Sequence, residues 1–369
     1  MLRKSDQAVL VTGATGFIGR HVVKRLLTSG GVVLALARGR RGLTAEQRIR
    51  KIFGPASRRL KVIEGDLACP NTIRRACAAL ALHVGTVIHC AGETSFMRGD
   101  EPSACAVQID GPLLLLELLR SLSIGSWSQV STAFVCGRRS GIIYESEGDM
   151  GQEFRNQYER LKLESEIRIK QACRQLGVEF RIFRPSIVIG AAPATSGGMP
   201  SNLFFAFIRA LMALTHSRAG LNASVRIHAC PQTSFQIVPV EYVAAAIEQL
   251  TFHRQASGET FHLVSANPPS QKTVAEMISA RLGLNNLHLL DSSEELSDPS
   301  PLEARLARML LPYKEYLQQD VRFDCSCTLR LLENRNLQPP IIDIREMDRL
   351  VALAAHSGAR LEEQHTRLF

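Results

Sequence analysis

Short apolar runs alternate with segments of helical spacing along the first half of the chain. The apolar runs end in turn residues, as buried strands do. They predict strands over residues 8–11, 32–37, 60–64, 86–89, 129–132 and 178–184. Between these runs, apolar residues recur every three or four positions, which predicts helices over residues 17–27, 44–53, 71–82, 107–121 and 158–176.

Particular residues mark where these helices begin and end. Thr44 and Gln47 have the spacing of a capping box, in which each side chain binds the other residue's backbone N–H. Asn71 is a candidate cap for the next helix, and Gly30 and Gly31 stop the first one. Strands that alternate with helices predict a doubly wound α/β fold, the Rossmann arrangement, with a parallel sheet covered on both faces.

Right-handed crossovers in such a sheet bring the carboxyl ends of the strands to one edge, where ligands bind. Four segments follow predicted strands and therefore fall at that edge: residues 13–19, residues 89–92, Thr132 and residues 184–186. Any chemistry of the chain is expected to gather there.

The first of these segments is a glycine-rich turn, VTGATGFIG, from Val11 to Gly19. Gly13 permits the tight turn, Gly16 lets the backbone approach a pyrophosphate, and Gly19 lets the helix pack against the sheet. A turn without a ligand would not explain three glycines at this spacing between a strand and a helix. The predicted cofactor contacts in the turn are Gly13, Thr15, Gly16, Phe17, Ile18 and Gly19.

The end of the second strand predicts which dinucleotide binds. NAD-binding proteins place an acid there for the ribose hydroxyl, whereas this chain has Arg38 followed by Gly39, Arg40 and Arg41. Because a guanidinium binds phosphate and a carboxylate repels it, we predict NADPH, with Arg38 at the 2′-phosphate and Arg20 or Arg41 assisting. The alternative for each arginine is an exposed position in solvent.

A second candidate cluster joins Tyr158 and Lys162, four residues apart on a predicted helix, to Ser131 and Thr132 at the end of the fifth strand. The ammonium of Lys162 is expected to lower the pKa of Tyr158 toward neutrality, so that the phenol can exchange a proton with a substrate oxygen. A hydroxyl at the strand end could donate to the same oxygen. The Tyr–Lys pair alone could be a coincidence on a surface helix.

Beyond residue 190 the alternation loosens, and Pro, Gly and Ser gather between residues 191 and 201. We therefore expect an NADP-binding domain with the catalytic residues at 1–190. A smaller mixed α/β substrate-binding region with a helical C-terminal extension is expected at 191–369, interleaved with the first domain around 225–265. The apolar stretch from Leu203 to Ile208, with Leu211, Met212 and Leu214, is either the wall of a substrate channel or a buried core helix.

Composition changes this picture little. The chain of 369 residues carries a formal net charge of +9, which suits an anionic ligand or reflects a solvated basic surface. Its nine cysteines include no CxxC pair, and Cys325 with Cys327 lacks partners for a zinc site, so we predict no metal and a cytoplasmic location. Residues 1–7 leave no room for a signal peptide, and Glu117 and Arg120 interrupt the Leu-rich stretch, which argues against a transmembrane segment.

Taken together, the motifs resemble those of the extended short-chain dehydrogenases/reductases over most of residues 8–270. The resembling stretches are TGATGFIG at 12–19, GDL at 65–67, HCAG at 89–92, VST at 130–132, the Tyr158/Lys162 pair and RPSIVIG at 184–190. The resemblance implies that Thr132, Tyr158 and Lys162 are the catalytic residues. The further cofactor contacts that it implies are Asp66 and Leu67 near the adenine, Ala91 and Gly92 after the fourth strand, and Pro185, Ser186 and Ile187 near the nicotinamide.

Within that superfamily the chain looks most like the male-sterility, fatty acyl-CoA reductase and thioester-reductase branch. The segments that carry this likeness are HCAGETSF at 89–96, STAFVCG at 131–137, VPVEYVAAAI at 238–247, FHLVSANPP at 261–269 and LPYKEYL with FD between 311 and 324. The branch implies reduction of an acyl thioester, on coenzyme A or a carrier protein, to an aldehyde or alcohol. It also implies a possible homodimer.

Other functions stay open at this point. An NADP(H)-dependent ketone or alcohol oxidoreductase is the main alternative. A sugar-nucleotide epimerase or dehydratase fits less well because the second strand ends without an acid, and an NADPH-sensing regulator would not need Tyr158 and Lys162. No nucleic-acid-binding module is recognisable. One departure from the family concerns Gln108, which stands where the family usually has an Asn that supports proton transfer.

Overall fold

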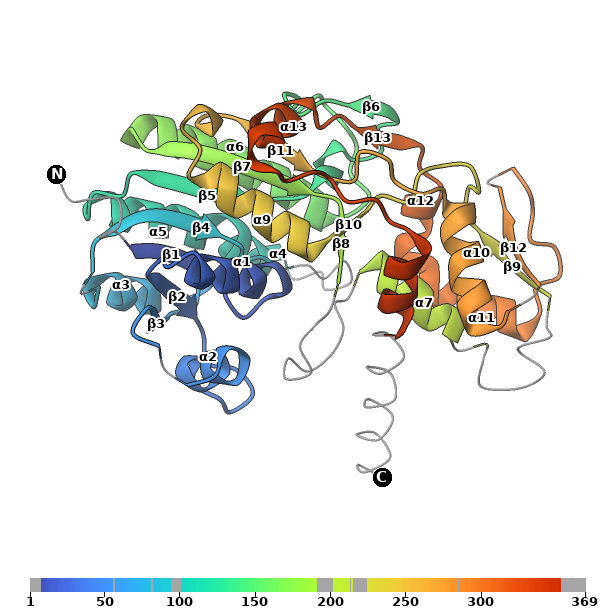
Figure 1. Ribbon diagram of the computed structural model, residues 1–369, viewed down its shortest axis with the longest axis horizontal. Helices are drawn as coiled ribbons and strands as arrows, with labels where there is room; N and C mark the ends of the chain where they lie inside the picture. The colour runs from blue at the N-terminus through green and yellow to red at the C-terminus, as the bar shows by residue number, and fades with distance from the viewer. Residues whose placement is uncertain are drawn as a thin grey trace.

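A computed structural model of the chain describes residues 8–55, 57–80, 82–93, 101–190, 202–212, 214, 224–284, 286–291 and 293–352. Residues 1–7, residues 94–96 of the HCAGETSF stretch and the Pro/Gly/Ser cluster from 191 to 201, on which parts of the sequence analysis rest, lie outside the described residues. Figure 1 shows the described part as a large sheet layer beside a second, mainly helical lobe.

The large sheet has seven parallel strands in the order β3-β2-β1-β4-β5-β7-β11. Their bounds are β1 Ala8–Thr12, β2 Val33–Ala37, β3 Leu60–Glu64, β4 Val84–His89, β5 Ser126–Val130, β7 Glu179–Pro185 and β11 Thr260–Leu263. Every residue of β1, β2 and β5 is buried, as expected for strands that helices cover on both faces. The predicted doubly wound fold is confirmed.

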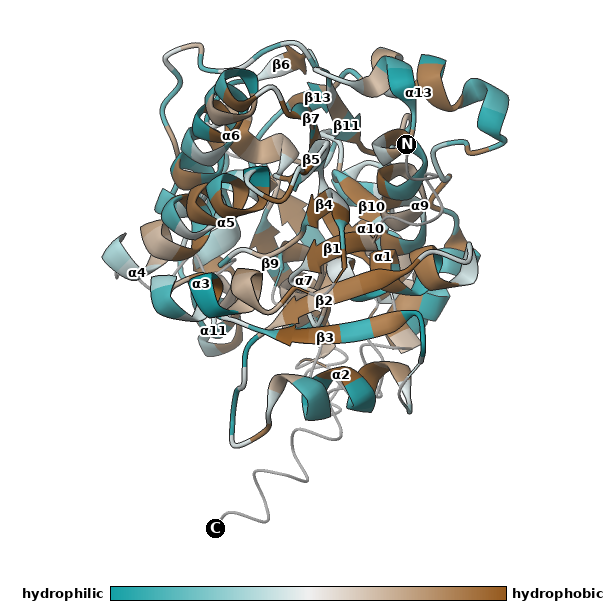
Figure 2. Ribbon diagram, turned by 90° about the vertical axis from the view of Figure 1, so that its left-hand side faces the viewer, coloured by the Kyte–Doolittle hydropathy of each residue, from teal (hydrophilic) through white to brown (hydrophobic). Residues whose placement is uncertain are grey.

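Helices cover the sheet on both faces, as Figure 2 shows edge-on. One face carries α1 (Phe17–Thr28), α2 (Ala45–Phe53), α9 (Val240–Thr251) and α13 (Ser326–Leu332), whose apolar residues share one core with the strands. The other face carries α3 (Pro70–Ala78), α5 (Gly111–Arg120) and α6 (Gln157–Leu176), which form a second core. The sheet is therefore buried between two helical layers.

The helix boundaries test the capping signals. Thr44 and Gln47 form the predicted capping box of α2, with reciprocal bonds of 3.2 Å and 2.9 Å. The prediction that Asn71 caps the next helix was wrong. Cys69 is the cap residue of α3 and Pro70 occupies its first turn, because proline at this position loses no helical hydrogen bond.

The predicted single helix over 107–121 consists of three parts: α4 (Glu101–Cys105), a π-helical turn (Ala106–Asp110) and α5. Taken as one helix, Pro102–Arg120 is long and apolar enough to cross a membrane, which the sequence argument from Glu117 and Arg120 did not foresee. Such a helix is weak evidence for a membrane span, since core helices pass the same test. Leu115, Leu116 and Leu119 pack here into the core of the sheet layer.

The second lobe has its own apolar core. It contains α7 (Leu203–Met212), α10 (Gln271–Leu282), α11 (Pro301–Leu310), α12 (Lys314–Leu317), the helical residues 344–352, and the parallel pair β9 (Val225–His228) and β12 (Leu287–Leu290). Two further parallel pairs join the lobes: β8 (Ile187–Ile189) with β10 (Ile237–Pro239), and β6 (Gly141–Ile143) with β13 (Val321–Phe323). Short 3₁₀ turns lie at Ala133–Cys136, Arg254–Ala256, Leu311–Tyr313 and Glu333–Arg335.

The chain crosses between the lobes repeatedly. α9 and β11 come from the second half of the sequence, yet they belong to the first sheet layer. The buried carboxylate of Glu145 fixes this return, because it accepts hydrogen bonds from the backbone of His262 on β11 and from the backbone and hydroxyl of Thr328 on α13. The sheet edge that the sequence singled out is thereby walled on one side by the second lobe.

Candidate active site

The glycine-rich turn joins β1 to α1 with its backbone packed closely on the neighbouring strand end. Gly13 has a φ of +65°, and a Cβ there would lie 2.6 Å from the backbone nitrogen of Ala91. A Cβ on Gly19 would strike the Gly13 carbonyl. Both positions therefore require glycine, which lets the turn pack tightly and brings the N-terminus of α1 to the sheet edge where a pyrophosphate would approach.

A group of arginines stands beside this turn. Arg38, the predicted phosphate contact, forms a 3.0 Å ion pair with Asp66, and its side chain is 43 % exposed. Arg48 on α2 donates to the Arg38 carbonyl and, over 2.9 Å, to the Thr15 hydroxyl. Burial and the positive charges of Arg40 and Arg38 lower the pKa of Arg48, which indicates a site short of negative charge.

The sequence pattern does not single out Arg48, which lies ten residues after Arg38 on the helix predicted over residues 44–53. The signal that could have found it is the capping box at Thr44, which fixes the helical turn that aims Arg48 at the glycine-rich turn. Of the proposed helpers, Arg41 is exposed, whereas Arg20 donates to the Gly16 and Thr15 carbonyls.

The other predicted adenine and strand-end residues differ in placement. Asp66 lies at the sheet edge with Arg38, but the side chain of Leu67 is buried in the core beneath α3 and α5. Ala91 donates its backbone N–H to the Thr12 hydroxyl over 3.2 Å, which fixes the strand end next to Gly92.

Thr132 and Tyr158 come together as predicted from their positions at one sheet edge. Thr132 follows β5 and starts the turn Ala133–Cys136, and Tyr158 lies in the first turn of α6. A hydrogen bond joins their side chains. Burial nevertheless raises the pKa of Tyr158, against the lowering by Thr132, so the expected fall toward neutrality was wrong for this state of the protein.

Lys162 explains part of that difference. Its Nζ lies 5.9 Å from the centroid of the Tyr158 ring and donates to the Val130 carbonyl over 3.2 Å. Burial lowers the pKa of Lys162 itself to about 8, against the raising effect of Cys90 and Glu166. The Lys162 side chain is thus held near the Tyr158 ring by its bond to the end of β5.

Gln108 lies beside Lys162 in the π-helical turn. A Cβ on Gly92 would be 2.8 Å from Lys162 Nζ and 2.9 Å from Gln108 Oε1, so both side chains flank this glycine. The Gln108 amide donates to the Glu93 carbonyl over 2.9 Å, and its backbone carbonyl accepts from Ser165 over 2.6 Å. Gln108 thus lies within a π-helical turn, a distortion common at functional sites.

A cavity of about 320 Å³ opens beside Thr132 and Tyr158. Its walls are Gly16, Phe17, Ile18, Cys90, Gly92, Ser131, Thr132, Phe134, Tyr158, Pro185, Ser186, Ile187, Val188, Asn202, Leu203, Tyr313 and Tyr316. The hydroxyl of Ser186 is buried without a hydrogen-bond partner among the described residues, which is costly unless a ligand supplies one, whereas the Ser131 hydroxyl bonds to Glu166. The glycine-rich turn, the Ser186 hydroxyl and the free helix end together fit a nicotinamide dinucleotide.

Most of the apolar stretch after residue 201 forms a buried core helix, which is the second of the two roles that the sequence left open. Residues 203–208 of α7 are buried in the core of the second lobe, and Leu203 lines the cavity. The expected channel wall was therefore wrong for the rest of the described stretch. Phe134, Tyr313 and Tyr316, which sequence analysis did not single out, form aromatic walls instead.

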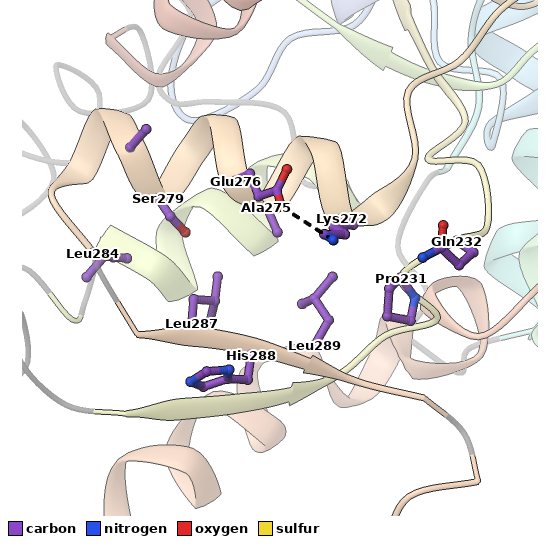
Figure 3. A pocket seen from close by; sticks show the side chains of 11 residues that line it. Pro231, Gln232, Lys272, Ala275, Glu276, Ser279, Leu284, Leu287, His288 and Leu289 are labelled. Atoms are coloured by element: carbon purple, nitrogen blue, oxygen red, sulfur yellow. Dashed lines mark ion pairs between the residues drawn. The ribbon is translucent and has the colours of Figure 1, made fainter.

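A larger cavity, of about 640 Å³, lies away from this chemistry, between α10 and β12 (Figure 3). Leu287 and Leu289 point toward α10, and Lys272 faces Glu276 at 3.9 Å. It contains none of the predicted catalytic or cofactor residues, so size alone does not mark the active site of this molecule.

Comparison with known sequences gives the same family. The profile of the family described as male sterility protein matches residues 11–247. A dTDP-4-dehydro-6-deoxy-D-allose reductase of Streptomyces is 30 % identical over 196 residues, which are 51 % of this chain and 58 % of that protein. A fatty acyl-CoA reductase of Drosophila melanogaster is 26 % identical over 54 % of this chain and 46 % of its own length. The chain thus spans about half the length of these curated relatives.

Solved structures share the fold. The terminal R domain of the myxalamid PKS-NRPS biosynthetic pathway superposes with a TM-score of 0.76 at 21 % identity, covering 97 % of this chain and 92 % of that one. UDP-glucuronic acid 4-epimerase of Bacillus cereus in complex with NAD gives 0.69 at 17 % identity, with coverage of 95 % and 99 %. The matching family profile and the shared fold lead to one conclusion: the chain belongs to the male sterility protein family and has the Rossmann-type fold of the extended short-chain dehydrogenases/reductases.

Proposed function

We propose that the protein is an NADPH-dependent reductase that transfers hydride to the carbonyl carbon of an acyl thioester, held on coenzyme A or a carrier protein, to give an aldehyde or alcohol. The observation that carries the proposal is the cavity itself. Among the described residues that line it, none bears a charge. The acyl group is the part of the substrate that would enter this cavity, and it needs apolar and aromatic walls such as Phe134, Leu203 and Tyr316.

The protein's own residues have clear roles in this reaction. The bound dinucleotide supplies the hydride. Tyr158 donates a proton to the carbonyl oxygen, and the Thr132 hydroxyl, already hydrogen-bonded to Tyr158, orients that oxygen. The resulting hemithioacetal loses the carrier thiol, as the C–S bond breaks and the hydroxyl proton passes to sulfur, to leave the aldehyde. A second transfer of hydride and a proton to the aldehyde would give the alcohol. The raised pKa of Tyr158 keeps the phenol protonated at neutral pH, which suits a proton donor in reduction. Lys162 stabilises the phenolate that remains and offers its other N–H groups to ribose hydroxyls.

The preference for NADPH rests on the arginines beside the turn. Arg48 places its guanidinium at Thr15, where the adenosine ribose would lie, and the guanidinium of the neighbouring Arg38 pairs with Asp66. A 2′-phosphate would bring negative charge to Arg48, whose pKa is lowered by burial and by the charges of Arg40 and Arg38. NAD would bring no such charge.

The names of several relatives support the thioester over other carbonyl substrates. An NRPS-like oxidoreductase of Fusarium equiseti is 24 % identical over 63 % of this chain, and the fatty acyl-CoA reductase is among the matches. The Streptomyces relatives, reductases of a keto sugar nucleotide by name, favour the alternative of a ketone reductase. The aromatic and apolar walls of the cavity favour the thioester over the keto sugar nucleotide.

The test is NADPH consumption by the purified protein with matched pairs of substrates: an acyl-CoA, the same acyl group on a phosphopantetheine, the corresponding aldehyde, a simple ketone and a keto sugar nucleotide. We expect turnover with both thioesters and the aldehyde. Turnover with ketones while every thioester is left unreacted would replace this proposal by the ketone-reductase alternative.

A further inference from the structure

Tyr316 is the point at which the second lobe reaches the catalytic helix. It lies on α12, lines the active-site cavity and packs edge-on against Phe134, with ring centroids 5.2 Å apart. Its hydroxyl donates to Glu159 Oε1 over 2.5 Å and accepts from Asn156 Nδ2 over 2.8 Å. The Tyr316 hydroxyl of the second lobe therefore bonds both to the residue that caps α6 and to a residue of its first turn.

The two residues that Tyr316 contacts, Asn156 and Glu159, flank the catalytic Tyr158 in the sequence. Asn156 is the N-cap of α6, where its side-chain oxygen accepts from the backbone of Glu159 over 3.0 Å. Tyr158 lies between the two in the sequence. Whatever holds Asn156 and Glu159 in place therefore holds the backbone from which the Tyr158 side chain projects.

Glu159 is fully buried and its charge is balanced by Arg155. The two side chains are 0 % and 4 % exposed, with Arg155 Nη1 at 2.8 Å from Glu159 Oε1 and the Arg155 backbone N–H at 3.1 Å from Oε2. The Arg155 guanidinium also lies 4.7 Å from the centroid of the Tyr316 ring. A buried pair of this kind keeps its geometry only while its hydrogen bonds are complete.

We propose that Tyr316 is a positioning residue for Tyr158: through Glu159 and Asn156 it fixes the first turn of the catalytic helix when the second lobe is docked. The same ring forms a wall of the cavity, so one side chain couples closure of the substrate space to alignment of the proton donor. The proposal rests on Tyr158 as the proton donor, but not on the identity of the acyl carrier.

Tyr316→Phe tests it, because this change removes the hydroxyl and keeps the ring against Phe134. We expect kcat to fall about tenfold, since a small displacement of a proton donor costs one to two orders of magnitude. KM for the carbonyl substrate and the dissociation constant of NADPH are expected to stay within about twofold. A loss confined to KM would contradict the proposal and assign Tyr316 to substrate binding alone.

Glu315→Gln is the matched control. Glu315 is the neighbouring residue on α12 and makes an exposed bidentate ion pair with Arg138, at 2.8 Å and 2.9 Å, that also joins the second lobe to the first. It contacts neither Asn156 nor Glu159 in the described structure. We expect wild-type kcat for this variant, and an equal loss in both variants would show that any weakened lobe contact has the same effect.

A double variant separates positioning from general damage. In a Tyr158→Phe background, Tyr316→Phe should cause no further loss of kcat, because the proton donor that it aligns is already absent. Losses that multiply in full would overturn the proposal. Hydrogen exchange gives a readout without substrate: the amides of residues 157–160 should exchange faster in Tyr316→Phe than in wild type or Glu315→Gln. Unchanged exchange there would also reject the positioning role, whereas absence of thioester turnover would reject only the proposed substrate.

Discussion

Thr132, Tyr158 and Lys162 lie at one sheet edge, yet each meets a different environment. Tyr158 gains a hydrogen bond from Thr132 but loses solvent, and loss of solvent dominates its pKa. Lys162 loses solvent as well, which lowers its pKa to about 8. Desolvation therefore drives both groups toward their neutral forms, and a bound dinucleotide has to act on that starting point.

The role of Tyr158 is open to a direct test. Tyr158→Phe should bind NADPH as wild type does and lose about 10²–10⁴-fold in turnover, because only proton transfer is removed. Thr132→Ala should slow turnover too, whereas Ser131→Ala should matter less. Steady-state kinetics with fluorescence titration of NADPH will measure both quantities. A Tyr158→Phe enzyme within a few-fold of wild type would overturn the mechanism.

Cofactor choice belongs to single arginines. Arg48→Ala and Arg38→Ala should each reduce the preference for NADPH over NADH, by about ten- to a hundredfold for the residue that makes the charge-assisted phosphate contact. Arg41→Ala, an exposed arginine on the same segment, is the control and should keep the preference. Titration with both cofactors measures the ratio. Unchanged ratios in both test variants would remove the arginines from this role.

The pKa of Lys162 predicts a pH dependence of cofactor binding. The ammonium is present below about pH 8 and is lost above it, because burial favours the neutral amine. NADPH affinity of the free enzyme should therefore fall as pH rises through about 8, while the arginines stay charged. Lys162→Met should bind more weakly, with no step between about pH 7 and 9. A wild-type affinity that is constant over that range would argue against a charged Lys162 in binding.

At the scale of elements, Ala106–Asp110 shows how a helix adapts to an unusual side chain. The π-helical turn directs the Gln108 amide at the Glu93 carbonyl and places Oε1 beside Lys162. The Ser165 hydroxyl on α6 donates a hydrogen bond to the Gln108 backbone carbonyl. The turn thus holds Gln108 by its side chain and by its backbone at once.

Replacing that amide should be costly. Gln108→Leu removes the donor to the Glu93 carbonyl and a polar neighbour of Lys162 from a buried side chain, so we expect a loss of about 1 kcal/mol in the free energy of unfolding and a lower kcat. Urea unfolding and kinetics measure the two effects. Glu117→Gln, an exposed change on the following helix, is the control. An unchanged unfolding free energy for Gln108→Leu would mean that the amide is not structurally required.

Sequence patterns predicted most of these elements for a physical reason. Strands covered on both faces must be apolar throughout, and the apolar runs at 8–11, 32–37 and 86–89 were therefore recognisable. The cap of α3 was misplaced, because Asn71 is a good cap in isolation while Pro70 decides the helix start. No local pattern distinguishes a π-helical turn from an α-helix, so the interruption at Gln108 could not be foreseen.

The candidate site was predictable to a similar degree. Residues that follow strands were found because parallel topology sends them to one edge, and Thr132, Tyr158, Pro185 and Ser186 do line one cavity. Arg48 and Tyr316 were not found. Each reaches the site from a helix whose placement depends on tertiary packing, and neither belongs to a spacing that signals chemistry by itself.

At the scale of the whole molecule, the sheet is assembled from both halves of the sequence. β11 pairs with the outer edge of β7, and α9 covers α1. A fragment of residues 1–190 would expose that strand edge together with the apolar face of α1, where Val22, Val23 and Leu26 are buried in the full chain.

We therefore expect the 1–190 fragment to aggregate or to bind NADPH far more weakly than the full chain, although it holds every predicted catalytic residue. Gel filtration and NADPH titration of both proteins measure this. The control is a mixture of that fragment with the separately produced remainder, residues 191–369, which should restore binding if the missing strand and helix are the cause. A soluble 1–190 fragment with full NADPH affinity would refute the idea that the later residues complete the cofactor domain.

The late position of β11 in the sequence affects how the protein folds during its synthesis. A ribosome releases the chain from its N-terminus at about 5–20 residues per second, and domains ordinarily fold as they emerge. Here the first sheet lacks its seventh strand until residues 260–263 have left the exit tunnel. For several seconds the nascent chain therefore carries the complete set of reacting side chains beside an unpaired strand edge. We expect a chaperone to bind this unpaired strand edge during the interval. The edge is covered only when β11 pairs with β7.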